Sequence, residues 1–155
     1  MAIATTVSRY LSRQGVEYDI LSHPHSSSSG ETAQASHVPG ALLAKPVLLE
    51  DEIGYLMAVV PSNRQVDLGE LQRQMNRRLG LATERQIGAL FPDCEVGALP
   101  PLGPAYGIET VVDNEIAEQP DIFFEAGDHE QLIHVSAETF SSLLGDEVWR
   151  GDISH

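Results

Sequence analysis

The sequence predicts an α+β domain in which helices surround a mixed, largely antiparallel sheet. Short polar turns separate two pairs of apolar runs, residues 44–49 with 55–60 and residues 122–126 with 131–135, and each pair is typical of a β-hairpin. Segments with helical periodicity lie between and beside these runs. Because hairpins outnumber strand–helix–strand crossovers, we expect antiparallel pairing to dominate a sheet of six or seven strands.

The N-terminal part of the chain predicts a helix, a strand and a second, short helix before the first hairpin. The first helix begins at a capping threonine, Thr5 or Thr6, carries an apolar stripe and ends at Gly15. Residues 16–20 alternate apolar and polar side chains, as in a half-buried strand. Residues 23–30 are a Ser-rich loop, and the short helix follows over residues 31–37.

Two more helices are predicted after the first hairpin. Asp67 and Glu70 have the spacing of a capping box, and the helix that they open ends at Gly80. Thr83 caps the next helix, which is short and runs to about residue 90.

The C-terminal part predicts strands and loops, followed by one helix. Residues 94–99 form a short strand that leads into a rigid, proline-containing loop, and residues 108–112 form a strand that ends in a turn at Asp113. The second hairpin comes next. The last helix begins at the capping residue Ser136 and ends at Gly145.

Composition indicates one domain with a substantial core. The chain has 155 residues, and 42% of them are hydrophobic. No run approaches the ~20 apolar residues that span a bilayer, and the N-terminus lacks a signal-peptide pattern. The single cysteine, Cys94, excludes an internal disulfide and suits a reducing compartment, so we expect a cytoplasmic protein that does not bind membranes. The histidines lack the paired spacing of a zinc site, so we expect no metal and no cofactor.

The net charge of −14 is unevenly distributed. Residues 93–155 carry fourteen acidic residues against Arg150 alone, a balance of −13, whereas residues 64–85 carry five arginines against three acidic residues, a balance of +2. Of these arginines, Arg73 and Arg77 are four residues apart and share one face of the predicted helix. A protein that grips duplex nucleic acid needs a broad basic face. We therefore expect no DNA binding, and only local contact with any other nucleic acid.

Lys45 is the single lysine of the chain, and it lies within the apolar run of residues 41–49. A buried ammonium group is costly unless an anion or a strong hydrogen-bond acceptor meets it. One interpretation is a structural lysine whose amine reaches solvent or a carboxylate. The other is a group at the floor of a pocket that binds an anion or a carbonyl oxygen of a ligand.

A second candidate for ligand binding is the loop that runs from Gly97 through Pro101 to Gly103. Glycine and proline let such a loop present backbone N–H and C=O groups with little entropy to lose. The sequence has no nucleophile elbow, zinc-protease helix or phosphate-binding loop. Cys94 is a poor nucleophile because the neighbouring carboxylate of Glu95 raises the pKa of a thiol, so a packed core cysteine is favoured.

A set of short motifs resembles the YbaK-like proteins and the editing domain of bacterial prolyl-tRNA synthetases. The resemblance covers residues 1–145 as a single domain and leaves residues 146–155 as a C-terminal tail. It implies that the sheet is barrel-like. It rests on His23 at the end of the first strand and on residues 31–33, 44–45, 55–61, 66–68, 81–84, 97–103 and 112–113.

The resemblance implies an aminoacyl-tRNA deacylase that edits in trans, by hydrolysing the ester between a wrongly attached amino acid and the terminal ribose of tRNA. Water would attack the ester directly, assisted by a free hydroxyl of that ribose. The family's lysine corresponds to Lys45 as the catalytic residue, and its Gly-x-x-x-Pro loop runs from Gly97 to Pro101. The other residues implied to bind substrate are His23, Thr32, Gly103, Asp113 and His129.

The implied partners are the acceptor end of a mischarged tRNA and an aminoacyl-tRNA synthetase. The sequence departs from the family pattern in two places. Pro46 follows the lysine where the family often has a hydroxyl residue, and it removes an N–H donor from the strand. The Gly-Asp-His-Glu turn at residues 127–130 marks a more acidic branch. Both departures concern the identity of the amino acid removed more than the chemistry.

Two other functions compete with this hypothesis. A non-catalytic module could use the same lysine to bind a small aminoacylated or nucleotide ligand, while the acidic C-terminal half docks a protein partner. A general esterase is disfavoured because the nucleophile elbow is missing.

Overall fold

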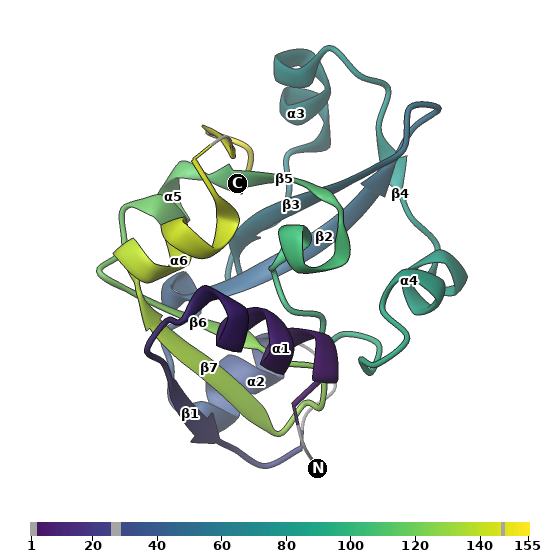
Figure 1. Cartoon of the computed structure of the whole chain (residues 1–155). Coiled ribbons are helices and arrows are strands. Elements are labelled where there is room, and N and C mark those ends of the chain that lie inside the picture. Colours follow the sequence, from purple (N-terminus) through teal and green to yellow (C-terminus); the bar gives the residue numbers. More distant parts are fainter. Residues whose placement is uncertain (1–2, 26–28, 147) are drawn as a thin grey trace.

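The computed structural model describes residues 3–25, 29–146 and 148–155. Over these residues the chain forms one eight-stranded mixed sheet with six α-helices around it (Figure 1). The strands are β1 (Asp19–Ser22), β2 (Leu43–Glu50), β3 (Tyr55–Pro61), β4 (Gly80–Leu81), β5 (Glu109–Asp113), β6 (Asp121–Glu125), β7 (Gln131–Ser136) and β8 (Trp149–Gly151). The helices are α1 (Thr5–Gln14), α2 (Ser29–Ser36), α3 (Leu68–Met75), α4 (Glu84–Leu90), α5 (Asn114–Ala117) and α6 (Ala137–Leu144), with short 3₁₀ helices at Gly40–Leu42 and Gly103–Tyr106.

The strand order is β1-β7-β6-β2-β3-β5-β8, and β4 pairs separately with β2. Four strand pairs are antiparallel and three are parallel, so the mixed, largely antiparallel α+β class is confirmed. β1 and β8 are the two ends of this path, so the sheet is open rather than barrel-like. β8 lies in the segment after residue 145 that the sequence predicted as a tail, and the nearby Ile153 is fully buried.

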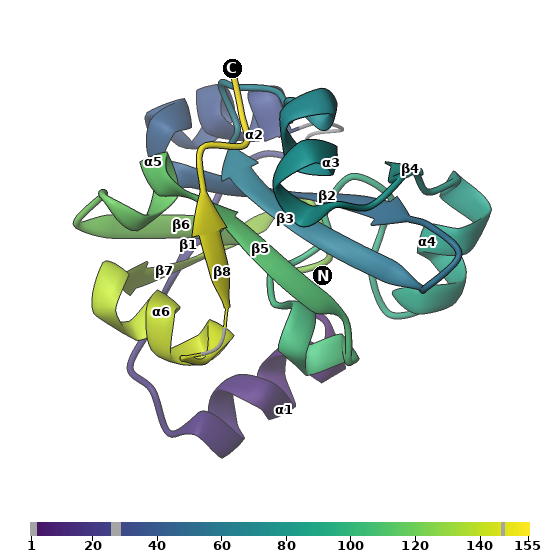
Figure 2. The same ribbon diagram turned by 90° about the horizontal axis from the view of Figure 1, so that it is seen from above.

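The central strands bury both of their faces. Leu48 of β2 and Met57 of β3 belong to a hydrophobic cluster that includes residues of α1 and α6. Leu49 and Leu56, their neighbours along the strands, belong to a second cluster that α3 covers. α1 and α3 accordingly lie on opposite sides of β3 and β5 (Figure 2). Burial on both faces explains why residues 55–60 read as a continuous apolar run rather than an alternating one.

α3 begins as predicted but ends earlier. The carboxylate of Asp67 accepts a hydrogen bond from the backbone N–H of Glu70 at 3.1 Å, so the predicted N-terminal cap is present. At Asn76 the backbone adopts a left-handed conformation with φ of 54°, which ends the helix before Gly80. Arg77 therefore lies outside the helix.

Residues 94–99 do not form the predicted strand. Gly97 has φ of 85°, a left-handed conformation that turns the chain away from an extended path. The backbone N–H of Ala98 bonds locally to the carbonyl of Glu95 at 3.1 Å, which replaces a ladder hydrogen bond. The segment is an irregular loop, which we call the Gly97 loop (residues 94–101).

None of the helices in the described ranges combines the length and the apolarity needed to cross a lipid bilayer.

Candidate functional site

The edge of β2 that faces away from β3 is only partly paired. β6 pairs with residues 43–44 and β4 with residues 49–50, so within the described chain no strand covers residues 45–48 on that side. The carbonyl of Leu48 points to this side, because it accepts a hydrogen bond from the N–H of Ala82 at 3.0 Å. Bonding direction alternates along a strand, so the nitrogen of Pro46 faces the same gap. Pro46 therefore removes no hydrogen bond from the β2–β3 ladder.

A cleft of about 380 Å³ occupies this gap. Its walls come from the exposed edge of β2, from the β4–α4 segment and from the Gly97 loop. Its lining is mainly apolar: Lys45, Pro46, Val47, Leu48, Leu81, Ala82, Glu84, Ile87, Val96, Gly97 and Leu99. Lys45 is its only basic residue and Glu84 its only acidic one. The fold thus brings the single lysine and Gly97, which is 52 residues further along the chain, to one concave site.

Lys45 is half-buried and lines this site. Its ammonium nitrogen donates a hydrogen bond to the backbone carbonyl of Arg64 at 2.9 Å. Burial lowers the pKa of Lys45 below its usual value. The partner is a neutral carbonyl that uses one of three N–H donors, so charge and donors remain for an anionic or carbonyl ligand.

The Gly97 loop is bonded to the turn between β6 and β7. The N–H of Glu95 donates to the carbonyl of Gly127 at 2.8 Å, and Nε2 of His129 lies 2.6 Å from the carbonyl oxygen of Val96. Pro101, at the end of the loop, and Gly103, just after it, are buried and do not line the cleft. A Cβ atom at Gly103 would collide with the side chain of Thr110, so close packing requires glycine there.

A buried polar cluster lies next to the loop. It contains His23, Thr32 and His129, which the sequence suggested, and Glu125, which it did not. Glu125 is 2% exposed, and its pKa is raised to about 8, mainly by burial. The nearby carboxylates of Asp128 and Glu95 raise this pKa further, whereas a hydrogen bond from Thr32 lowers it. A charged residue within an apolar run is the signal that identified Lys45, and Glu125, within the apolar run of residues 122–126, carries the same signal.

Asp113 lies in neither the cleft nor this cluster. Its carboxylate caps α5 by accepting from the N–H of Glu115 at 2.8 Å, and its other oxygen accepts from the N–H of Ile153 at 2.9 Å. Residues 113–114, predicted as a turn, thus begin a short helix. The contacts of Asp113 join that helix to the C-terminal segment.

Cys94 is a poor nucleophile in the folded protein. Its pKa is raised to about 12, mainly by burial. Its sulfur lies 3.4 Å from the hydroxyl of Tyr106 and 3.6 Å from the carboxylate of Asp93. The predicted packed cysteine is therefore what the structure shows.

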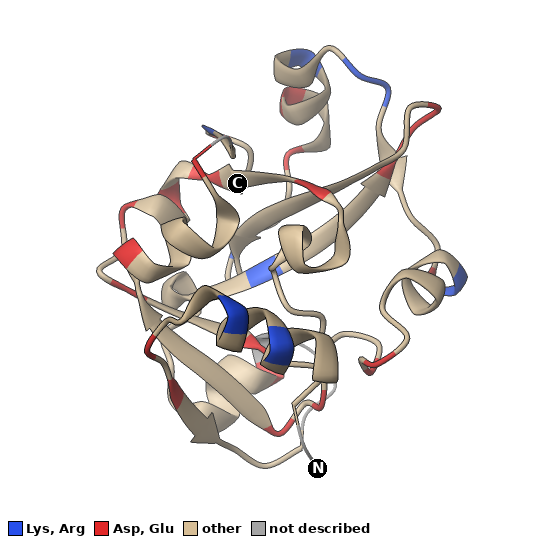
Figure 3. Cartoon of the chain, viewed as in Figure 1, with Lys and Arg blue, Asp and Glu red and all other residues tan. Residues whose placement is uncertain are grey.

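The two arginines predicted to share a helix face are both engaged by carboxylates. Arg77 binds Asp51 through two hydrogen bonds of 2.7 and 2.9 Å and binds Glu109 at 2.9 Å, while Arg73 pairs with Glu70. The hydrogen bonds from Arg77 are the largest cause that holds the pKa of Asp51 far below its usual range. Basic residues are spread over several elements, among them α1, α4 and the end of α3 (Figure 3). The predicted basic pair is thus absent.

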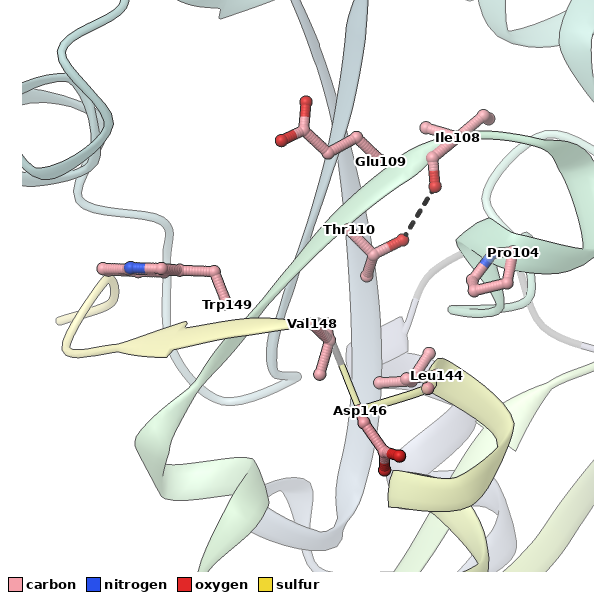
Figure 4. Close-up of a pocket in the computed structure, with 9 residues that line it drawn as sticks. Pro104, Ile108, Glu109, Thr110, Leu144, Asp146, Val148 and Trp149 are labelled. Atoms are coloured by element: carbon pink, nitrogen blue, oxygen red, sulfur yellow. Dashed lines mark hydrogen bonds between the residues drawn. The ribbon is translucent and has the colours of Figure 1, made fainter.

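Another cavity, of about 650 Å³, lies between β5, β8 and the end of α6. Figure 4 shows Thr110, Val148 and Leu144 around it, with the Thr110 hydroxyl bonded to the carbonyl of Ile108 at 3.0 Å. Glu109 and Trp149 point away from its centre (Figure 4). No buried charged group converges on this space among the residues drawn, which makes the cleft at Lys45 the better candidate. In the described ranges, no three His, Cys, Asp or Glu side chains form a group that could hold a metal ion.

Comparison with known protein families identifies the class to which this chain belongs. Residues 23–143 match the model of the aminoacyl-tRNA editing domain, and the chain belongs to that family. A search of curated proteins finds no match.

Solved structures share the whole fold at low sequence identity. A protein proposed to be a trans-editing enzyme for prolyl-tRNA synthetase has 21% identity and a TM-score of 0.83, over 97% of this chain and 95% of that one. A scaffold protein from work on epitope grafting has 22% identity and a TM-score of 0.84, over 98% and 97%. A longer protein of Marinobacter aquaeolei, proposed to act in signal transduction, has 24% identity and a TM-score of 0.79, over 99% of this chain and 31% of that one.

Proposed function

We propose that this protein is an aminoacyl-tRNA deacylase that edits mischarged tRNA in trans. The observation that carries the proposal is the convergence of Lys45 and the Gly97 loop on the mainly apolar cleft at the gap in β2. The family supplies the substrate class, an aminoacyl ester of tRNA. The cleft volume of about 380 Å³ suits the terminal aminoacyl group and part of its nucleoside.

In this mechanism a water molecule attacks the carbonyl carbon of the ester. The bond from that carbon to the ribose oxygen breaks, the ribose oxygen takes up a proton, and free amino acid and tRNA are released. The Lys45 ammonium stabilises the developing negative charge on the ester oxygen or holds the terminal phosphate. A neighbouring ribose hydroxyl of the substrate orients the water, so the protein needs no nucleophile of its own.

Selection of the amino acid is proposed to be steric. The walls of the cleft are largely aliphatic, and the Gly97 loop bounds one side of it. A missing methylene changes binding by only ~1–3 kcal/mol, so a wall that a larger residue cannot enter discriminates better than fit alone. His23 and Thr32 remain predicted substrate contacts, whereas Asp113 accepts backbone hydrogen bonds outside the cleft and His129 contacts the Gly97 loop. The partners are the acceptor end of a mischarged tRNA and a synthetase, and we expect the reaction in the cytoplasm.

A deacylation assay against a panel of mischarged tRNAs, with tRNA for proline included, tests the proposal. We expect release of the amino acid from at least one mischarged species and none from the correctly charged tRNA. Binding of these tRNAs without any release would contradict the deacylase and support a non-catalytic binding module.

Replacing Cys94 with serine is expected to leave most of the deacylase activity, because water and not the thiol attacks the ester. Serine replaces the largely buried thiol with a more polar hydroxyl, which should lower the stability of the fold slightly. Single-turnover hydrolysis and a melting curve check both statements. A covalent acyl adduct on Cys94, detected by mass spectrometry of the intact protein, would contradict direct attack by water.

tRNA binding by the isolated protein is expected to be weak, with a shallow salt dependence. The net charge of −14 repels a polyanion, and Arg73 and Arg77 are paired with carboxylates, which leaves Lys45 and few other contacts. Each neutralised phosphate contributes about −0.7 to −0.9 to the slope of log affinity against log salt, so two or three contacts give a slope near −2 to −3. Affinity for a mischarged tRNA as a function of ionic strength measures it. A slope steeper than about −5 would reveal an extended basic contact surface.

A further inference from the structure

His129 contacts the backbone of the Gly97 loop. Its Nε2 lies 2.6 Å from the carbonyl oxygen of Val96, which is adjacent to Gly97. A carbonyl oxygen can only accept, so Nε2 must carry the hydrogen of this bond. The side chain of His129 is 3% exposed, and its backbone has φ of 59°, so it is held in a sparsely populated conformation within the β6–β7 turn.

The other ring nitrogen of His129 meets Glu125. Nδ1 lies 3.3 Å from Oε2 of Glu125, whose side chain is 2% exposed. When Nε2 carries the hydrogen of a neutral ring, Nδ1 has only a lone pair. An ionised carboxylate also has only lone pairs, so the two atoms would repel each other. The contact is attractive when the carboxyl group of Glu125 carries a proton and donates it to Nδ1.

We propose that His129 is a positioning residue that holds the Gly97 loop against the cleft through the Val96 carbonyl, and that one proton shared with Glu125 fixes its ring. This inference rests on the proposed deacylase function for its catalytic consequence, although the loop contact itself does not.

The surroundings determine when that proton is lost. His23 faces the other carboxyl oxygen of Glu125 at 3.7 Å, Thr32 hydrogen-bonds to the carboxyl, and Asp128 and Glu95 add negative charge. The ring of His25 packs edge-on against His129 at 5.5 Å between centroids.

Burial and the two neighbouring carboxylates favour retention of the proton at neutral pH. The pKa of Glu125 is about 8, so the proton leaves as pH rises through that value. The lone pair of Nδ1 then faces a carboxylate, and the ring is expected to turn away from it. The loop keeps its bond from the N–H of Glu95 to Gly127 but loses the bond at Val96.

NMR of the whole protein between pH 6 and pH 9.5 tests the positioning role without any substrate. The ¹³C shift of the Val96 carbonyl and the ¹⁵N shifts of the His129 ring report the hydrogen bond directly. We expect both to change together with a midpoint near pH 8. In Glu125→Gln the amide can donate to Nδ1 at every pH, so both signals should stay constant.

Two substitutions of His129 separate positioning from folding. His129→Gln keeps an N–H donor near the position of Nε2 and should retain the Val96 shift without its pH dependence. His129→Ala should lose the shift at all pH values and lower single-turnover deacylation roughly tenfold, the effect of one lost hydrogen bond. His134→Gln is the matched control, because that histidine also contacts two carboxylates, Asp19 and Asp121, but does not touch the loop.

A wild-type pH response in Glu125→Gln, or an unchanged Val96 carbonyl in His129→Ala, would overturn the positioning role. A protein that shows the expected NMR titration but hydrolyses no mischarged tRNA would contradict the proposed function alone.

Discussion

Lys45→Ala is expected to abolish measurable deacylation while the protein stays folded. Among the described residues that line the cleft, the ammonium is the only basic group. Losing a charge contact made in the transition state typically costs ~2.7–4 kcal/mol, or 10²–10³ in rate. Stability should change little, because removal relieves the burial that lowers the pKa of Lys45 but leaves the carbonyl of Arg64 without that donor. Single-turnover hydrolysis and thermal melting measure the two effects.

Two further variants show whether a loss of activity comes from the lost charge of Lys45. Lys45→Met keeps the length of the side chain and removes its charge, so it should be as inactive as the alanine variant. Arg13→Ala removes a positive charge from the end of α1, outside the cleft, and should hydrolyse tRNA esters like wild type. Equal activity of wild type and Lys45→Met would refute a role for the ammonium, whereas unfolding of both Lys45 variants would make Lys45 a structural residue.

Glu125→Gln is expected to stabilise the protein increasingly as the pH rises. The folded state raises the pKa of Glu125 from 4.5 to about 8, so its protonated form is favoured by folding. The stability from this group is fully present below pH ~4.5 and is lost as pH rises through about 8. Glutamine cannot ionise, so the free energy of unfolding of the variant should rise relative to that of wild type as the pH rises. The increase should be roughly 3 kcal/mol between pH 4 and pH 7, and somewhat more at pH 8.

Urea unfolding of the two proteins at several pH values measures the difference in the free energy of unfolding. Glu118→Gln is the matched control, because it removes the same charge from an exposed position at the end of α5. A constant difference between Glu125→Gln and wild type from pH 4 to pH 8 would show that folding does not raise the pKa of Glu125.

Much of the local structure follows from the sequence because its signals are local. Both predicted hairpins form, and Thr83 caps α4 with the reciprocal hydrogen bonds of a capping box. Strands β4 and β8 were not predicted, because segments of two and three residues show no periodicity. They are strands only because they pair with β2 and β5. The predicted strand at residues 94–99 failed because the left-handed Gly97 and the contact of Glu95 with Gly127 outweigh strand propensity.

For the charged residues too, the sequence predicted some features and only the structure showed their contacts. A lone lysine in an apolar run was enough to identify Lys45 as unusual, but the sequence did not reveal that Arg64 would meet it through a backbone carbonyl. Arg73 and Arg77 had helical spacing, yet the left-handed Asn76 directs the second of them to Asp51. Spacing predicts which residues share a helix face only while the helix continues.

By itself the sequence determined the α+β class, the family and the two features that define the candidate site, the lysine and the glycine–proline loop. These depend on residue type, order and short-range pattern. Only the tertiary structure decided that the sheet is open, that a gap in β2 forms the cleft and that Glu125 lies against His129. Strand partners and the surroundings of a buried charge are set by contacts between residues far apart in the chain, which no local pattern encodes.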